Sequence, residues 1–376
     1  MKNAPIYLDF NASTPLDPRV AEVMQDMLSD AYGNPSSTHW AGEPARVAVE
    51  RARRQVADLL GCKPQEVIFT SGGSESNNMA IKGIAEGHDP EQVHIITSQV
   101  EHPAVTEPCL YLERRGATIT WLPADRFGQV KPADVEAAIR PQTTLVTIMH
   151  ANNEVGTIQP IEDIARIASA HGVPMHTDAA QSVGKISTRV DELGVDMLTI
   201  AGHKLYAPKG VGALFVREGI ELPPLVHGAG HERGRRAGTE SALLNAALGK
   251  ACVLARDLSG MNEIKALGDR FWQQLQKALG ERVVMNGHPD ERLPNTLNLS
   301  FPGQVGADVL AAMPELAAST GSACHAGMLE MSPVLSAMGV PAEIGAGAIR
   351  FSLGRSTKGQ ELDWVARRLS QIVLAP

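Results

Sequence analysis

The sequence predicts an α/β protein, with a mostly parallel, doubly wound sheet in a large domain and a smaller α+β domain. Short apolar runs alternate with stretches long enough for helices, which is typical of parallel strands joined by helical crossovers. These runs cover 118–122, 145–149, 173–177, 196–200 and 211–216. Several of them end directly at polar residues, as expected at the carboxyl edge of such a sheet, where ligands bind. The large domain is predicted to span 15–255, and the smaller domain to combine 1–14 with 256–376.

The composition is that of a soluble globular protein. Hydrophobic residues make up 43% of the 376 residues and charged residues 20%. No apolar run reaches the roughly 18 residues that a membrane span needs, and the first residues lack the apolar region of a signal peptide. The net charge of −8 disfavours unspecific nucleic-acid binding. We therefore expect a cytoplasmic protein without membrane or nucleic-acid partners.

The first part of the chain is predicted to form an extended segment, two helices and a strand. Residues 7–15 are extended and end at a proline, and a helix begins at Pro18, because proline is favoured in the first helical turn. Apolar residues recur at helical spacing over 43–60, and 67–70 has the composition of a strand.

A glycine pair follows this strand. Gly72, Gly73 and Ser74 stand between the strand and a helical continuation. Backbone N–H groups at such a helix start can hold a phosphate. Taken alone, the pattern is more often only a capped helix start.

The next two strands end near histidine and asparagine side chains. His102 follows the strand 94–98, where its ring could stack on a cofactor or move protons, although a structural, hydrogen-bonded histidine is the alternative. The strand 145–149 runs into Asn152 and Asn153, whose amides can hold a ring substituent or a carboxylate.

An acid and a lysine end two later strands. Asp178 and Gln181 follow the run 173–177, and Lys204 lies 26 residues after Asp178. A desolvated lysine can form a Schiff base with an aldehyde, and an acid can keep a pyridine nitrogen protonated. Alone, the lysine is more often solvated or bound to a phosphate, and the aspartate is more often a cap or an ion-pair partner. Together they indicate a pyridoxal phosphate (PLP) site.

The rest of the chain is predicted to link and build the smaller domain. A basic, glycine-rich loop over 226–240 suits an anion, and a long helical stretch is expected over roughly 241–279. The four cysteines have no CxxC spacing, so we expect neither a metal site nor a disulfide framework. Only Cys324 has unusual surroundings, because glycines flank it.

Eight motifs in order make the chain similar to the class V aminotransferase family of PLP enzymes, of the NifS-like cysteine desulfurase and selenocysteine lyase type. The resemblance runs nearly end to end and implies the PLP-dependent fold type I. The motifs are Leu8-Asp9 with Ala12-Ser-Thr-Pro15, Gly33-Asn-Pro-Ser36, Thr70-Ser-Gly-Gly-Ser-Glu-Ser76, Glu101-His102, Asn152-Asn-Glu154, Asp178-Ala-Ala-Gln181, Gly202-His-Lys204 and Gly321-Ser-Ala-Cys324.

The resemblance implies a role for each cofactor contact. Lys204 would carry the aldehyde of PLP, and Asp178 would pair with the pyridine nitrogen. Gln181 would face the phenolic oxygen, and His102 would stack on the ring as one of the catalytic residues. The phosphate would be bound by Gly73, Ser74 and His203 and, from the neighbouring subunit of a homodimer, by Thr239.

The resemblance also implies how the substrate is bound and used. Asn153 and Arg350 would hold the substrate carboxylate, with Arg350 as a bidentate partner. Cys324 would attack the substrate sulfur as a thiolate, leaving L-alanine and a persulfide for a sulfur-acceptor protein. L-Cysteine and L-selenocysteine are both open as substrates. A transaminase and a regulatory, partner-binding subunit are less favoured alternatives.

Two features depart from the family pattern. Ala201 stands where many desulfurases have a serine, so one hydroxyl of the phosphate site is absent. The sequence ends at Pro376, soon after the last expected helix, without the longer tail of desulfurases that serve iron–sulfur scaffolds.

Overall fold

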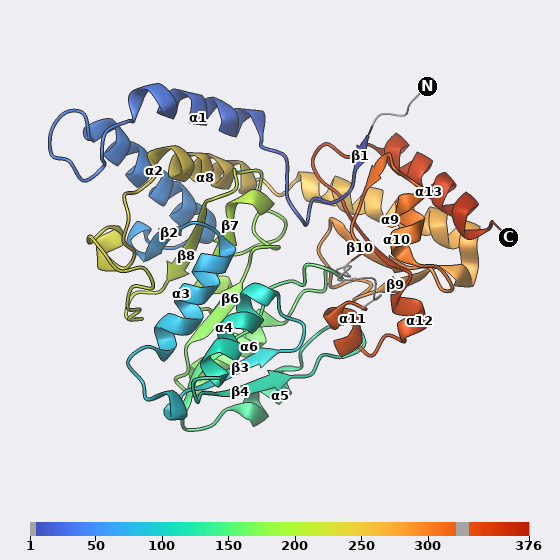
Figure 1. Cartoon of the computed structure of the whole chain (residues 1–376), viewed down its shortest axis with the longest axis horizontal. Helices are drawn as coiled ribbons and strands as arrows, with labels where there is room; N and C mark the ends of the chain where they lie inside the picture. Colours follow the sequence, from blue (N-terminus) through green and yellow to red (C-terminus); the bar gives the residue numbers. More distant parts are fainter. Residues whose placement is uncertain (1–4, 321–330, 376) are drawn as a thin grey trace.

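A seven-stranded sheet forms the centre of the larger part of the computed structural model, which describes residues 5–320 and 331–375 (Figure 1). In spatial order the strands are β2 (Val67–Thr70), β8 (Gly212–Val216), β7 (Met197–Ala201), β6 (Met175–Asp178), β5 (Thr143–Thr147), β3 (His94–Ser98) and β4 (Thr118–Leu122). All neighbouring pairs from β7 to β4 are parallel, and β8 is antiparallel to β2 and β7. The predicted mostly parallel, doubly wound sheet is therefore confirmed, with strand bounds within two residues of those expected.

Helices cover both faces of this sheet because side chains alternate along each buried strand. Ile95 and Leu145 pack on one face against α3 (Gly73–Ala85) and α4 (Pro103–Glu113). Their neighbours Ile96 and Val146 belong to the core on the other face. The helices of that second face are α1 (Pro18–Asp30), α2 (Glu43–Leu60), α5 (Pro132–Ala138), α6 (Ile161–Ala170), α7 (Val190–Leu193) and α8 (Ala242–Ala255).

The long helical stretch expected over roughly 241–279 is helical but is divided into two helices. The chain forms α8 and then a separate helix, α9 (Gly260–Leu279). Between them, the Asp257 carboxylate accepts a hydrogen bond from the Ser259 backbone N–H at 2.9 Å. An aspartate that caps its own backbone in this way, followed by a glycine, favours a turn over a continuous helix.

The C-terminal part builds a second hydrophobic core. β10 (Thr296–Ser300) lies between β9 (Val284–Asn286) and β12 (Ala348–Ser352), both antiparallel to it. β1 (Ile6–Tyr7), from the start of the chain, pairs in parallel with β11 (Leu316–Ala317). The N-terminal segment therefore packs with α9, α10 (Gly306–Ala311) and α13 (Gly359–Val373), as Figure 1 shows. The domain boundaries near 15 and 255 remain a prediction.

Short elements complete the described chain. A small apolar cluster joins Val100 and Val155 to α11 (Pro333–Ala337) and to Ala348 of β12, next to α12 (Ala342–Gly345). The 3-10 helices are η1 (Pro64–Glu66), η2 (Pro90–Gln92), η3 (Gly202–Lys204), η4 (Glu232–Gly234) and η5 (Gly280–Arg282). Over 5–320 and 331–375, none of the helices combines the length and the apolar character needed to cross a bilayer.

A buried arginine anchors the loop that contains η4. The Arg53 side chain, 2% exposed, donates to both carboxylate oxygens of Glu232, at 2.7 and 3.0 Å, and to Glu240 at 3.2 Å. Glu232 and Arg233 have positive φ angles of 47° and 58°, a conformation that side chains other than glycine rarely adopt. The ion pair therefore holds a strained turn against α2.

Candidate active site

A cavity of about 360 Å³ opens at the carboxyl edge of the sheet, beyond β3, β6 and β7. Ligand sites of doubly wound sheets lie at this edge. The cavity brings together nine of the predicted site residues: Gly73, Ser74, His102, Asn153, Asp178, Gln181, His203, Lys204 and Arg350. They come from separate strand ends, from the start of α3 and from β12, so the fold assembles them from distant positions in the sequence.

Lys204 lies at the end of β7, in η3, with its side chain in the cavity. Its Nζ donates to the backbone carbonyls of Asn11 and, at 2.9 Å, of Ala12. Burial and then the Arg350 guanidinium lower the pKa of Lys204 to about 8, against the smaller opposing effects of Asp178 and Asp9. Roughly a tenth of this amine is therefore unprotonated at pH 7, far more than for an ordinary lysine, and the unprotonated form is the nucleophile toward an aldehyde.

Asp178 ends β6 and is held by two hydrogen bonds. The Asn77 side-chain amide donates to its Oδ2 at 2.7 Å, and the Ala180 N–H donates to its Oδ1 at 2.9 Å. Asn77 is fully buried in α3, and its own Oδ1 has no partner among the described atoms. Sequence reasoning missed Asn77, although a polar residue on the buried side of a helix was a usable signal.

The start of α3 forms the end of the cavity that suits an anion. The first N–H groups of a helix have no intrahelical acceptor, and Gly73 and Ser74 place such groups at the cavity wall. Gly72 has φ 151° and ψ −177°, a conformation essentially restricted to glycine, and a Cβ on Gly212 would lie 2.7 Å from the Gly72 Cα. The Ala201 methyl group borders the same end, 3.3 Å from a Cβ built on Gly73.

Two histidines line the cavity as neutral rings. Burial lowers the pKa of His102, and burial and then Lys204 lower the pKa of His203 to about 4. The Nδ1 of His102 accepts a hydrogen bond from the Ala104 N–H at 3.0 Å, capping α4. The proton of this neutral ring therefore lies on Nε2. His203 Nδ1 lies 3.4 Å from the Ser13 hydroxyl.

Gln181 belongs to a buried network that sequence reasoning also missed. Its Nε2 donates to the Asn11 carbonyl at 3.0 Å, and its Oε1 accepts from Lys185 Nζ at 3.0 Å. Lys185 also donates to Asn11 Oδ1 at 3.2 Å. Burial, with the charges of Lys204 and Arg350, lowers the pKa of Lys185 well below its usual value. These bonds direct the Gln181 Nε2 toward the Asn11 carbonyl and its Oε1 toward Lys185.

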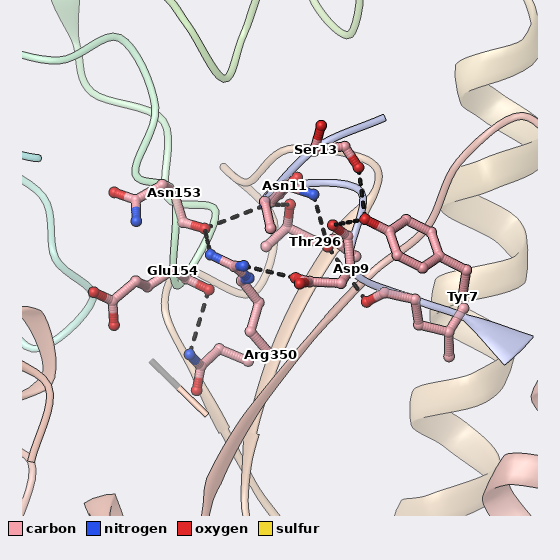
Figure 2. Close-up of polar contacts among 12 residues, drawn as sticks. Tyr7, Asp9, Asn11, Ser13, Asn153, Glu154, Thr296 and Arg350 are labelled. Carbon is pink, nitrogen blue, oxygen red and sulfur yellow. Dashed lines mark hydrogen bonds and ion pairs between the residues drawn. The ribbon is translucent and has the colours of Figure 1, made fainter. Parts of the chain in front are cut away.

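Arg350 extends from β12 and lines the cavity. Figure 2 shows its polar contacts. Its Nη1 donates to the Asn153 backbone carbonyl at 2.9 Å, and its Nη2 donates to Asp9 Oδ1 at 2.8 Å. Figure 2 shows the carbonyl of Asn153, and not its side-chain amide, directed at the guanidinium. The Arg350 Nε is buried without a partner among the described atoms. The guanidinium therefore has donor capacity left for a ligand carboxylate.

Thr239 and Cys324 are the two remaining predicted site residues. Thr239 lines a separate hollow with Arg236 and Gly238, so its proposed role in the site of a second subunit stays a prediction. Cys324 lies outside the described residues.

The donor set of the cavity fits PLP. An amine with a pKa of about 8, a carboxylate with both oxygens held, an unpaired helix start and a neutral imidazole correspond to its aldehyde, pyridine nitrogen, phosphate and ring face. Each group comes from a different element, and all of them face one space.

Comparisons with known proteins agree with this geometry. The family described as Aminotransferase class-V matches residues 6–365. The chain is 46% identical over 375 residues to "Cysteine desulfurase IscS" of Dictyoglomus turgidum, covering 98% of this chain and 94% of that protein. It is 44% identical over 374 residues to "Cysteine desulfurase" of Homo sapiens, covering 98% and 82%.

Solved structures give the same result. A "NifS-like protein" aligns with a TM-score of 0.92 at 36% identity, over 98% of this chain and 99% of that one. A structure titled "SspA in complex with cysteine" aligns with a TM-score of 0.81 at 41% identity, over 92% and 98%.

Proposed function

The chain belongs to the class-V aminotransferase family, and we propose that it is a PLP-dependent cysteine desulfurase that converts L-cysteine to L-alanine. The observation that carries this proposal is the Lys204 amine, whose pKa falls to about 8 in one cavity with Asp178 and Arg350. Its relatives support cysteine over selenocysteine, because they are named cysteine desulfurases and one solved relative is titled as a complex with cysteine.

The residues that would hold PLP follow from the cavity. Lys204 would bond to its aldehyde, and Asp178, fixed by Asn77, would face the pyridine nitrogen. The phosphate would lie at Gly73 and Ser74. His203 and, from a second subunit, Thr239 complete that proposed set, with Gln181 at the phenolic oxygen and His102 on the ring face. When bound, PLP supplies an electron sink for bonds at the substrate α-carbon.

The protein's own groups have distinct tasks in this reaction. Arg350 and Asn153 are proposed to hold the substrate carboxylate, which fixes the α-carbon relative to Lys204. The Lys204 Nζ, with a pKa of about 8, can take a proton from that carbon and return one as general base and acid. His102 carries its proton on Nε2 and can stack or donate there, since its Nδ1 is already an acceptor.

Cys324 is proposed to accept the sulfur. As a thiolate, its Sγ would attack the substrate sulfur and form the S–S bond. The substrate C–S bond breaks with its electron pair left on the carbon, which a proton converts to alanine. The resulting persulfide could pass its outer sulfur to an acceptor protein. A homodimer and a cytoplasmic location remain predictions.

The test is alanine release from L-cysteine and from L-selenocysteine by wild type, Lys204→Ala and Cys324→Ser. Lys204→Ala should lose both turnover and the PLP-modified Lys204 peptide that borohydride reduction leaves for mass spectrometry. Cys324→Ser should lose alanine release from cysteine but keep appreciable release from selenocysteine, because a selenol is ionised near neutral pH and leaves more easily. A keto acid as product would instead indicate a transaminase. Normal cysteine turnover by Lys204→Ala would contradict the assignment.

A further inference from the structure

The proposed carboxylate-binding arginine already has a carboxylate partner. Arg350, whose side chain is 7% exposed, donates to Asp9 Oδ1 at 2.8 Å, and the Asp9 side chain is 22% exposed (Figure 2). The two residues are 341 positions apart in the chain. The Asp9 charge is therefore brought to the site by the fold, at the place where a substrate carboxylate would be bound.

Asp9 cannot easily move away from Arg350. The Tyr7 hydroxyl lies within hydrogen-bonding distance of the Asp9 and Ser13 carbonyls, at 3.1 and 2.7 Å. The backbones of Asp9 and Ser352 form a parallel β-bridge, in which the Ser352 N–H donates to the Leu8 carbonyl at 2.8 Å. Backbone contacts on both sides of Asp9 thus keep its carboxylate beside the guanidinium.

The guanidinium is shared, not saturated. Its two terminal nitrogens carry four N–H donors, of which the Asn153 carbonyl and Asp9 take one each. A ligand carboxylate can therefore bind while Asp9 stays in place. It then brings a second negative charge to one cation, in a partly buried site where such repulsion is weakly screened.

The Asp9 charge also acts on Lys204. Lys204 and Arg350 line the same cavity, and the Asp9 charge favours the protonated form of the Lys204 amine, so it also favours a cation in that part of the cavity. A ligand with both a carboxylate and an amine recovers at the amine part of what Asp9 costs it at the carboxylate. A ligand with a carboxylate alone has only the loss.

We propose, on the premise of the desulfurase function above, that Asp9 is a specificity-determining residue: it positions Arg350 and selects α-amino acids over carboxylates that lack the amine.

The experiment compares L-alanine with propionate, which share a carbon skeleton and differ in the amine. Dissociation constants for the PLP-loaded enzyme are measured by calorimetry, for wild type and for Asp9→Asn. Asparagine keeps an oxygen that accepts from Arg350 and removes the charge. We expect Asp9→Asn to bind propionate on the order of tenfold more tightly, with alanine binding unchanged or weaker.

Three further variants separate charge from structure. Asp9→Glu keeps the charge, so it should change the ratio of the propionate and L-alanine dissociation constants less than Asp9→Asn does. Asp17→Asn is the matched control, because Asp17 pairs with Arg19 and Arg355 outside the cavity. If Asp9→Asn fails to fold, Asp9→Ser supplies the same neutral comparison.

An unchanged ratio in a folded neutral variant, or equal weakening of both ligands, would overturn the selection role. Failure of the desulfurase proposal is a different result: the wild type would then neither bind alanine nor release it from cysteine.

Discussion

Replacing Arg53 with methionine should destabilise the protein by about 3–5 kcal/mol, the cost of breaking a buried ion pair by removing one partner. The Arg53 and Glu232 side chains are 2% and 3% exposed. Glu232 accepts from both terminal nitrogens of Arg53 and from the Phe69 N–H at 3.1 Å. Methionine keeps most of the apolar stem, so the change mainly leaves the Glu232 carboxylate without its cation.

A double variant separates the charge from the packing. Arg53→Met with Glu232→Met removes both members of the buried ion pair and leaves the half-buried Glu240 carboxylate without its arginine, so it should recover part of the stability that the single variant loses. Arg54→Met is the matched control, because Arg54 is the next residue of α2 and is exposed. It should change the free energy of unfolding by less than about 0.5 kcal/mol.

Equilibrium urea denaturation of the four proteins at one pH, with cofactor content held equal, gives the measurement. A loss in Arg53→Met no larger than that in Arg54→Met would refute the reasoning. So would a double variant that is less stable than Arg53→Met alone, since the unpaired carboxylate would then not be the cause.

Three other outcomes are expected. If the free amine of Lys204 is the group that bonds PLP, the rate at which the cofactor-free protein takes up PLP should rise with pH through about 8, and a profile flat from pH 7 to 9 would contradict this. Burial, and then the neighbouring Glu232, raise the pKa of Glu240 from 4.5 to about 7. The folded protein thus binds this proton more tightly, so stability should fall as pH rises from about 4.5 through about 7, and Glu240→Gln should flatten that part of a melting-temperature profile. Arg350→Lys should raise KM for cysteine by tenfold or more, roughly, with little change in bound PLP. Arg355→Lys should leave KM unchanged, because Arg355 stacks on Tyr206 at 4.4 Å outside the cavity, and equal effects of the two would refute the carboxylate role.

The fold could be predicted because its signals are local. Each strand is a short apolar run, and the polar residues that follow β6 and β7 must meet at one edge of a parallel sheet. The break between α8 and α9 was also local, at Asp257 and Ser259, but apolar spacing on both sides hid it. The prediction gave the helical spacing of the apolar residues more weight than the turn-forming residues Asp257 and Ser259.

Contacts between distant segments could not be predicted in the same way. Asn77 is 101 residues from Asp178, and Lys185 is 174 residues from Asn11. Their partners depend on how α3 and the N-terminal segment pack, which no periodicity in one sequence encodes. The pairing of Asp9 with Arg350 is the extreme case, because it requires the start of the chain to lie beside its last strand.

That pairing also sets an order of events during synthesis. β1 pairs with β11, the Asp9 carboxylate pairs with Arg350 of β12, and Asn11 also bonds to β12 and β10. At 5–20 residues per second, the ribosome needs roughly 20–70 seconds to add the 341 residues between Asp9 and Arg350. Through that interval, the sheet of the larger part can form and the Asn11 carbonyl can accept from Gln181, while β1 and the Asp9 carboxylate stay without their partners in β11 and β12. A nascent chain halted before β12 should therefore contain the Lys204 end of the site but lack Arg350, and the pairing of Asp9 with Arg350 should form only after β12 has been made.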